Sequence, residues 1–493
     1  MAKNLMIQGT MSGAGKSILT AGILRVLRRD GFRVAPFKSQ NMALNSFVTP
    51  DGREIGRAQA LQAQAAGMEP SADMNPILLK PMGDTTSQII VNGLPIGNMR
   101  AAEYFKMKKD LIPDIKAAYN RLAADTDIII IEGAGSPVEI NLRENDIVNM
   151  GLAEMLDAPV LLAGNIDPGG VFAQLLGTVQ LMSENEKARV KGLIINKFRG
   201  DVSLLEPGLD MFRPYLDIPF VGIVPYVELD LDEEDSVSER LKIRKNAGFG
   251  ENITGDIIEI KVIRLPFISN YTDFTILEGI PGVRLSYVNK AEDLKGADLI
   301  ILPGTKNTLS DLKWLKNEGL YDKLTDLGSA GTLIIGICGG FQMLGRLVRD
   351  KSGAEGGGEE KGLSLLPIDT DFKDEKTLSQ VSGEIGALEG VYKPLSGLNV
   401  AGYEIHMGET FAERAIFPVI TEGNVLGTYM HGIFDTADFT KALLKIIYEK
   451  RGINAEIPEV EAAAVHQDKE LDKLADVLRD SLDWKLIYSA IGI

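Results

Sequence analysis

Residues 4–17 read NLMIQGTMSGAGKS: a short apolar run, a glycine-rich turn, a lysine and a hydroxyl residue. A helical pattern follows from Lys16 to Arg29. In a phosphate-binding loop, backbone N–H groups and a helix N-terminus surround phosphate oxygens, while the lysine neutralises the terminal phosphates and the hydroxyl binds magnesium. The stretch therefore predicts a strand, a phosphate loop and a helix, which begin a nucleotide-binding α/β domain.

The spacing of this loop departs from the strict phosphate-loop pattern. Thr10 stands five positions before Gly15, where that pattern has glycine, and Gly9 comes one position earlier. An ordinary glycine-rich turn between strand and helix is the alternative interpretation. Because the strand-to-helix context that the motif requires is present, we expect phosphate contacts from Thr10, Gly13, Gly15, Lys16 and Ser17.

Polar residues follow other apolar runs, where open α/β sheets place their ligands. Glu132 ends the run DIIIIE and is predicted to bind Mg²⁺ together with Ser17, unless it is a solvated carboxylate in a turn. Lys38 follows FRVAPF and could reach the γ-phosphate or an acyl phosphate, although a surface charge is an equal alternative. Asn196 ends the run LIIN, where its amide could contact a purine edge.

Short apolar runs alternate with helical patterns through residues 1–230, which indicates βαβ units around a parallel sheet. A second alternating region follows a charged stretch and predicts a second α/β domain. The glycine-rich stretch between Arg349 and Glu360 is expected to be a mobile surface loop. Leucines at 471, 474, 478 and 482 predict an amphipathic terminal helix. We expect a nucleotide-binding domain at 1–235, a linker at 236–256, a second domain at 257–445 and a helical extension at 446–493.

Composition narrows the class of function. The formal net charge of −17 argues against non-specific binding to nucleic acid or to an anionic membrane. The chain has one cysteine, which excludes an intrachain disulfide and favours the reducing cytoplasm. Its apolar runs are far shorter than the roughly 20 residues of a membrane span. The start of the sequence lacks the long apolar stretch of a signal peptide.

That cysteine lies in GTLIIGICGGFQMLG, residues 331–345, which has the form of a nucleophile elbow. The turn between strand and helix would lift Cys338 clear of the sheet, and the N–H of Gly339 could stabilise an oxyanion. A single buried cysteine is more often an inert small apolar residue. The elbow pattern instead predicts a thiolate nucleophile.

A thiolate nucleophile requires a base, and the chain has three histidines. His431 follows a strand-like segment and is our candidate base, whereas His466 opens a helical region with no strand end near it. His406 either packs or binds substrate. A second oxyanion contact is expected from the backbone around Gly304 in LPGTKNT, and Gln342 joins His406 as a candidate for binding glutamine.

Together these motifs resemble the cobyric acid synthase family over nearly the whole chain. GT…GKS and EGAGS are similar to the dethiobiotin-synthetase-like phosphate-loop group, and KSQNMALNS with EIGRAQALQAQA resembles a segment of the cobyric acid enzymes. LPGTKNT, GICGGFQMLG, GYEIHMG and GTYMHGIFD resemble the triad-type glutamine amidotransferases. The resemblance implies a phosphate-loop domain joined to a flavodoxin-like, class I amidotransferase domain.

The resemblance also implies a reaction. Its substrate would be adenosylcobyrinic acid a,c-diamide, amidated at the b, d, e and g carboxylates with ATP, Mg²⁺ and glutamine and with no tightly bound prosthetic group. The family's nucleophile falls on Cys338 and its base on His431. Related amidotransferases carry glutamate two residues after the histidine, but here that position is Ile433, so the third member stays unassigned.

Three alternatives remain open from the sequence. One is the related amidase of the a and c carboxylates of cobyrinic acid, against which KSQNMALNS and the EIGRAQ segment argue. The second is a phosphate-loop switch of the partitioning-ATPase type with a degenerate amidotransferase domain, and the third is an inactive scaffold that retains the fold. The elbow at Cys338 disfavours the switch, because such a protein has no use for a thiolate.

Overall fold

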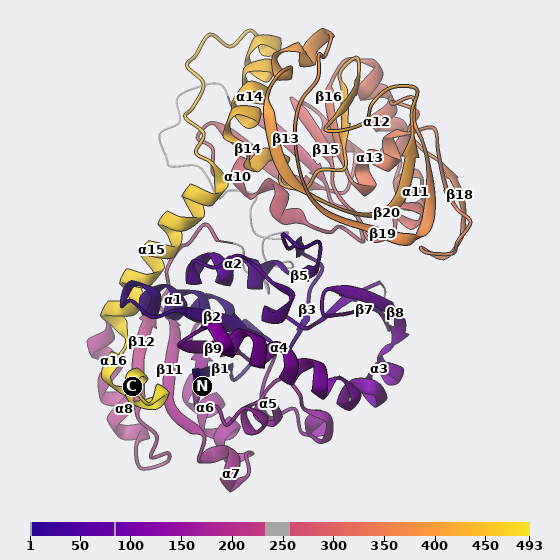
Figure 1. Cartoon of the computed structure of the whole chain (residues 1–493). Coiled ribbons are helices and arrows are strands. Elements are labelled where there is room, and N and C mark those ends of the chain that lie inside the picture. Colours follow the sequence, from indigo (N-terminus) through magenta and orange to yellow (C-terminus); the bar gives the residue numbers. More distant parts are fainter. Residues whose placement is uncertain (1, 83–84, 232–256) are drawn as a thin grey trace. The chain divides into compact units, whose positions relative to one another are not determined.

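The computed structural model describes residues 2–82, 85–231 and 257–493 (Figure 1). The chain divides into two compact units. Unit 1 comprises Met1–Ala43, Arg53–Asp235 and Gln467–Ile493, and unit 2 comprises Leu44–Gly52 and Ser236–His466. The linker expected at 236–256 lies outside the described residues. Neither unit is one uninterrupted range, because a short segment near Ser46 groups with unit 2 and the C-terminal residues group with unit 1.

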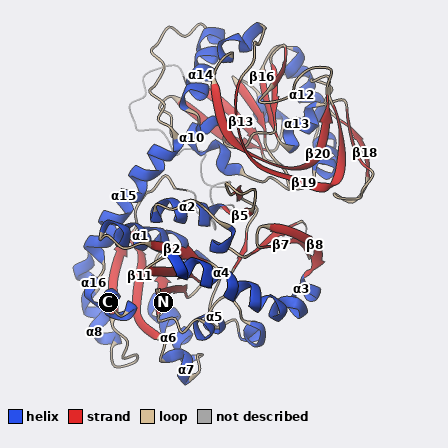
Figure 2. Ribbon diagram, in the orientation of Figure 1, coloured by secondary structure: helices blue, strands red, loops and turns tan. Residues whose placement is uncertain are grey.

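A parallel sheet lies at the centre of unit 1, in the order β12-β11-β10-β1-β9-β2. Its strands are continuous apolar runs because helices cover both faces, as Figure 2 shows. The parallel sheet expected from the alternation of apolar runs and helical patterns is therefore confirmed. Their bounds are β1 Lys3–Gly9, β2 Val34–Phe37, β9 Ile128–Glu132, β10 Val160–Asn165, β11 Val190–Phe198 and β12 Phe220–Pro225.

Alternate residues of each central strand enter opposite layers of the core. Ile129 and Ile131 pack with one group of helices, and Ile130 packs with the other. The first group is α4 Ile112–Asp125, α5 Met150–Met155 and α6 Val171–Gln180. The second is α1 Lys16–Arg29, α2 Arg57–Ala66, α15 Ala463–Ser481 and α16 Trp484–Ile491. Apolar packing covers both faces of the sheet, so we expect the functional polar side chains at the ends of its strands.

The terminal helix expected from its leucine spacing is α15, and it completes the core of unit 1. Leu474 and Leu478 are buried in the same cluster as α1. Arg25 Nε of α1 donates to Asp472 Oδ1 at 2.6 Å, which fixes the two helices along their polar edge. The C-terminal residues are therefore part of the nucleotide-binding unit in space.

A smaller sheet, in the order β3-β6-β7-β8, extends unit 1 beyond the central strands. Its strands are β3 Gln40–Met42, β6 Ile77–Pro81, β7 Thr86–Val91 and β8 Leu94–Arg100. Further short elements are β5 Glu54–Gly56, α3 Ala101–Met107, α7 Glu184–Lys187 and α8 Glu206–Phe212.

Unit 2 contains a sheet in the order β14-β13-β15-β16-β22-β21, in which only the edge strand β21 pairs antiparallel. Numbered along the chain, the parallel strands lie in the order 2-1-3-4-5, which is the flavodoxin-like arrangement. The α/β fold expected for both domains is confirmed. The bounds are β13 Ile258–Ile263, β14 Val283–Val288, β15 Leu299–Leu302, β16 Leu333–Ile337, β21 Ile420–Glu422 and β22 Val425–Thr428.

The other elements of unit 2 are helices and a second sheet in the order β18-β17-β19-β20. The helices are α10 Thr275–Glu278, α11 Thr308–Asn317, α12 Leu320–Ser329, α13 Gly339–Leu344 and α14 Ala437–Arg451. The strands of this sheet are β17 Leu347–Asp350, β18 Gly358–Lys361, β19 Asp369–Glu384 and β20 Asn399–Phe411. The short strand β4 Ser46–Val48 also groups with unit 2 but is not part of this sheet.

The glycine-rich stretch between Arg349 and Glu360, expected to be a mobile surface loop, connects two paired strands and is held by hydrogen bonds. Its two ends pair as β17 and β18. Asp350 accepts backbone N–H groups from Gly353, Ala354, Glu355 and Gly357 at 2.8–3.0 Å. A carboxylate that collects backbone donors in this way replaces the apolar contacts that the sequence lacks.

Candidate active sites

The phosphate loop lies between β1 and α1 at the carboxyl end of the central strand of unit 1. Gly15 has φ +83°, and a Cβ there would lie 2.3 Å from Asn196 Nδ2, so both conformation and space require glycine. Asn196 Nδ2 donates to Ala14 O at 2.9 Å. The structure places this amide against the loop backbone, where it holds the loop in shape, and its contact with a purine stays a prediction.

Lys16 is buried and folds back over the loop. Its Nζ donates to Met11 O at 3.1 Å, Ser12 O at 3.2 Å and Gly135 O at 3.3 Å. The ammonium group is thus held inside the ring of backbone that would surround a phosphate. It is placed where a terminal phosphate would be neutralised.

Two other loop residues that the sequence selected lie at its edges. Thr10 donates its hydroxyl to Gln174 Oε1 at 3.1 Å, and its N–H to Ala163 O at 2.9 Å. Gly13 faces open space, since a Cβ there would meet nothing within 4 Å. Thr10 therefore holds the start of the loop in place, and Gly13 borders open space.

Glu132 is buried at the end of β9 and collects three donors. Ser17 Oγ donates to Oε1 at 2.7 Å, Lys38 Nζ to Oε1 at 3.0 Å and Gln62 Nε2 to Oε2 at 2.6 Å. Burial acts to raise the pKa of Glu132, but the Lys38 charge and the three hydrogen bonds outweigh it, so the pKa is lowered. The carboxylate stays ionised, as a magnesium ligand must.

The structure thus brings together Ser17, Lys38 and Glu132, which the sequence predicted separately. It also adds Gln62, which the sequence did not single out. Gln62 Nε2 donates to Ser17 O at 3.3 Å as well, so one amide holds both the loop and Glu132. Its signal was present in EIGRAQALQAQA, where glutamines recur on a helix that is otherwise small and apolar.

Replacing Lys38 with methionine should lower the free energy of unfolding by about 3 kcal/mol, because it leaves the buried Glu132 without its cation. Adding Glu132→Gln should recover most of that loss. Denaturant unfolding measures both effects. The wild-type contribution of Glu132 is present above the ordinary pKa of a glutamate and is lost as pH falls through its lowered folded pKa.

The matched control is Arg33→Met, which breaks the exposed ion pair between Arg33 and Asp127. Exposed pairs contribute about 0–1 kcal/mol, so this change should have little effect. Equal losses in the two variants would contradict a special role for the buried pair.

Cys338 follows β16 at a sharp turn in unit 2, and α13 begins at the next residue. The cysteine has φ +51° and ψ −111°, a strained conformation for a residue with a side chain. A Cβ on Gly340 would lie 2.0 Å from Leu302 O, so the turn can pack against β15 only with glycine there. The nucleophile elbow predicted from the sequence is confirmed as a conformation.

His431 lies at the end of β22 and is held by a carboxylate that the sequence left unassigned. Its Nδ1 lies 2.7 Å from Asp273 Oδ2, and the N–H of Gly432 donates to Asp273 Oδ1 at 3.2 Å. Burial alone would lower the pKa of His431, but Asp273 and Cys338 oppose it, and the pKa is raised to about 10. The imidazole therefore favours its protonated form beside the thiol.

Asp273 lies far from His431 in the sequence, so no local motif connects the two residues. It belongs to a short turn, Tyr271–Phe274, that follows β13. A polar residue after an apolar strand was the available signal, because the carboxyl ends of parallel strands share one edge of the sheet.

The two predicted oxyanion residues, Gly304 and Gly339, lie where the LPGTKNT turn meets the start of α13. A Cβ on Gly304 would lie 3.1 Å from His431 Cε1, and one on Gly339 would lie 2.6 Å from Thr305 Cγ2. The LPGTKNT turn is therefore packed against both the histidine and the start of α13. Ser269 N donates to Gly304 O at 2.9 Å and fixes the turn.

Gln342 and His406 lie together beside the elbow. Gln342 accepts from Thr308 Oγ1 at 3.0 Å and donates to Tyr429 OH at 3.2 Å. The His406 ring stacks on Tyr429 at 3.7 Å, and its Nδ1 lies 2.7 Å from Gly408 O. Cys338 Sγ contacts the carbonyl of the neighbouring Ile405 at 3.4 Å. His466, by contrast, lies at the start of α15.

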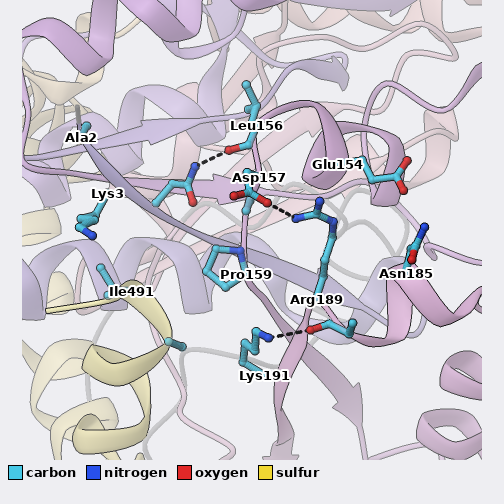
Figure 3. A pocket seen from close by; sticks show the side chains of 14 residues that line it. Ala2, Lys3, Glu154, Leu156, Asp157, Pro159, Asn185, Arg189, Lys191 and Ile491 are labelled. Carbon is cyan, nitrogen blue, oxygen red and sulfur yellow. Dashed lines mark hydrogen bonds and ion pairs between the residues drawn. The ribbon is translucent and has the colours of Figure 1, made fainter.

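Figure 3 shows a pocket of about 650 Å³ at the opposite edge of the unit 1 sheet. It opens at the amino ends of β1, β10 and β11, beside Lys3, Pro159 and Lys191. Arg189 Nη1 is paired there with Asp157 at 2.8 Å. Ligands of open α/β sheets bind at the carboxyl ends of the strands, so this pocket is not the nucleotide site.

Among the described residues, no helix is both long enough and apolar enough to cross a membrane.

Two family models match the two halves of the chain. Residues 5–237 match the CobQ/CobB/MinD/ParA nucleotide binding domain, and residues 259–439 match the CobB/CobQ-like glutamine amidotransferase domain. With the phosphate loop and the cysteine elbow described above, these matches define a glutamine amidotransferase joined to a nucleotide-binding domain.

Close relatives cover almost the whole chain. A cobyric acid synthase from Lachnoclostridium phytofermentans is 52% identical over 99% of this chain and 99% of its own length. Those from Ruminiclostridium cellulolyticum and Photorhabdus laumondii are 48% and 46% identical, each over 100% of this chain and over 97% and 98% of their own lengths. The chain belongs to the cobyric acid synthase family. It is an amide-forming ligase with an ATP-using nucleotide-binding domain.

Proposed function

We propose that this chain amidates the b, d, e and g carboxylates of adenosylcobyrinic acid a,c-diamide, with one ATP and one glutamine consumed per amide. The observation that supports it most directly is the presence, in one chain of this family, of a phosphate loop beside Glu132 and a Cys338–His431–Asp273 arrangement. ATP and glutamine are both cytosolic metabolites, so we place the reaction in the cytoplasm.

The first step is activation of a carboxylate, which is a poor electrophile by itself. The γ-phosphoryl group moves from ATP to a carboxylate oxygen, and ADP leaves. Lys16 and the N–H groups of the loop hold the phosphates in line, and Lys38 lies at the same strand end to receive the acyl phosphate. Gln62 keeps Glu132 in place during this transfer.

Magnesium fits this site. Ser17 Oγ and Glu132 Oε1 lie 2.7 Å apart, and both are oxygen donors of the kind that Mg²⁺ prefers alongside phosphate oxygens and water. These two residues would hold the ion. When bound, Mg²⁺ offsets the negative charge of the phosphates.

The second step makes ammonia. The Cys338 thiolate attacks the glutamine side-chain carbonyl, and the oxyanion that forms is stabilised by the N–H groups of Gly339 and Gly304. Protonated His431 gives its proton to the departing ammonia, which leaves a thioester on Cys338. Water then attacks the thioester carbonyl as His431 takes its proton, and the C–S bond breaks to release glutamate and restore the Cys338 thiolate, while Asp273 holds Nδ1 of His431 throughout.

Ammonia then displaces phosphate from the acyl phosphate to form the amide. Free ammonia is mostly ammonium at neutral pH and is then not nucleophilic, so its release inside the enzyme is an advantage. We assign Gln342 and His406 to glutamine binding, because Gln342 hydrogen-bonds Tyr429, His406 stacks on the same ring, and Cys338 Sγ contacts the carbonyl of Ile405 beside His406.

The reaction is tested by incubating the purified chain with the a,c-diamide, ATP, Mg²⁺ and glutamine. Each amidation replaces a hydroxyl group with an amino group, which mass spectrometry resolves. We expect products with up to four added amides, formed only when ATP and a nitrogen source are both present. Amidation of cobyrinic acid but not of its a,c-diamide would contradict the proposal.

Replacing Asp273 with asparagine should lower kcat for glutamine hydrolysis by about 100-fold, because His431 loses the charge that orients and protonates it. The pKa of His431, now about 10, should fall. The high-pH limb of the activity profile should therefore move to lower pH. Steady-state glutaminase rates across pH measure both changes.

The matched control is Asp293→Asn, which changes an exposed aspartate of the same unit. It should match the wild type in rate and pH profile. A Asp273→Asn variant with an unchanged pH profile would show that Asp273 does not set the protonation of His431.

A further inference from the structure

A segment from the amino-terminal half of the sequence is built into unit 2. Leu44–Gly52 groups with unit 2, although the residues on both sides of it, Ala43 and Arg53, group with unit 1. Val48 of this segment is fully buried in an apolar cluster with Tyr403 and Ile405 of β20. The segment is therefore part of the packed interior of unit 2 and not a loose surface loop.

Other contacts seat the same segment. Gln380 Nε2 of β19 donates to Val48 O. The Phe47 ring packs on the Tyr403 ring at 5.4 Å between centroids, and a Cβ on Gly52 would lie 3.2 Å from Leu378 O. Two strands of unit 2 thus hold the segment along its length.

The backbone of Ser46 makes two hydrogen bonds to buried side chains of unit 2. Its N–H donates to Asn270 Oδ1 at 3.2 Å, and its carbonyl accepts from Tyr403 OH at 3.1 Å. Asn270 and Tyr403 are 2% and 3% exposed, so water does not compete for these groups. One residue of the segment therefore fixes two side chains that lie far apart in sequence.

Both of these side chains contact His431. The Tyr403 ring stacks on the imidazole at 5.3 Å with an interplanar angle of 19°. Asn270 Nδ2 lies 3.4 Å from both Nδ1 and Nε2 of His431, and equal distances of this size place the amide over a ring face, because an in-plane position would overlap the ring carbon between the two nitrogens.

The orientation of the Asn270 amide follows from the segment. Its oxygen faces the Ser46 N–H, so its NH₂ group must face the histidine. The Asn270 backbone has φ +51°, a conformation that asparagine tolerates better than most residues. Two of the groups that contact the imidazole, Asn270 and Tyr403, are therefore held by Ser46.

We propose that Leu44–Gly52 is a positioning element for His431 and that glutamine hydrolysis depends on the contacts that hold this segment in unit 2. The proposal rests on the glutaminase role proposed for Cys338 and His431. The segment follows directly on the strand and loop that carry Lys38, the residue paired with Glu132. One continuous stretch of chain thus carries Lys38 of the proposed nucleotide site and, a few residues later, the segment that holds His431.

Tyr403→Phe tests the link without removing the stacked ring. It deletes the hydroxyl that donates to Ser46, and loss of that hydrogen bond should lower kcat for glutamine hydrolysis by about fivefold with little change in KM. The pH profile of hydrolysis should shift as the imidazole loosens. The matched control is Tyr321→Phe, which removes a similar hydrogen bond to Gly362 O elsewhere in unit 2 and should behave as the wild type.

Ser46→Pro tests the other contact, because proline cannot donate to Asn270. It should also lower glutamine hydrolysis, while amidation driven by ammonium salts continues in the same full-length protein. Both variants break a hydrogen bond made by the backbone of Ser46. The fall in the rate of glutamine hydrolysis in the double variant should therefore be smaller than the product of the two single effects.

The outcomes separate this inference from the proposed function. Hydrolysis rates and pH profiles equal to those of the wild type in both variants would overturn the role of the segment, and so would an equal fall in ammonium-driven amidation. If glutamine hydrolysis also survived Cys338→Ser, the proposed glutaminase site itself would be wrong. A loss in Cys338→Ser with no loss in Tyr403→Phe or Ser46→Pro would reject the segment alone.

Discussion

Cys338→Ser should abolish amidation from glutamine while amidation from added ammonium salts continues. A hydroxyl in place of the thiolate is a far weaker nucleophile, so we expect glutamine hydrolysis to fall by about 10⁴-fold or more. The ammonium-driven reaction needs only the phosphate-loop site. Measuring glutamate release and corrinoid amides from the same samples gives both rates.

The histidines supply the matched control for this result. His431→Ala should lose glutamine hydrolysis as Cys338→Ser does, because the two residues act as one unit. His466→Ala, at the start of α15, should behave as the wild type. Loss of ammonium-driven amidation in Cys338→Ser would contradict separate half-reactions.

Lys16→Ala should stop amidation from either nitrogen source. Lys16 is held inside the loop by three carbonyls, where its charge would stabilise the transferring phosphoryl group. Removing a preorganised charge of this kind costs about 10³-fold in rate. Glutamine hydrolysis measured without ATP should persist, because Cys338 and His431 are untouched.

Lys116→Ala is the control for that change, since Lys116 is an exposed lysine on α4. It should leave amidation at the wild-type rate. Amidation by Lys16→Ala at a comparable rate with ammonium would show that the loop does not serve phosphoryl transfer.

Several features of the fold could be predicted because each is written in contiguous residues. The apolar runs at 128–131 and 333–337 are buried strands, as their length and continuity indicated. The glycines around Cys338 and Lys16 indicated tight turns, and at Gly15 and Gly340 the turns require glycine. Such features depend on local conformation and on which residues avoid water, so neighbouring residues suffice to specify them.

The site was predicted less completely. Lys38 and Glu132 were selected separately as strand-end residues, and only the fold pairs them at 3.0 Å. The amide of Asn196 holds the loop in the structure, a role that the sequence did not indicate, while its contact with a purine stays a prediction. Gln62 is one of several glutamines in EIGRAQALQAQA, and only the packing of the folded chain selects it as the partner of Glu132.

The amino-acid sequence by itself determined the phosphate loop, the elbow at Cys338, the α/β class of both halves and the family. Tertiary structure decided that Asp273 holds His431 and that Leu44–Gly52 lies in unit 2. The physical reason is that these contacts join residues far apart in the chain. Their geometry depends on which strands become neighbours, and no local pattern records that.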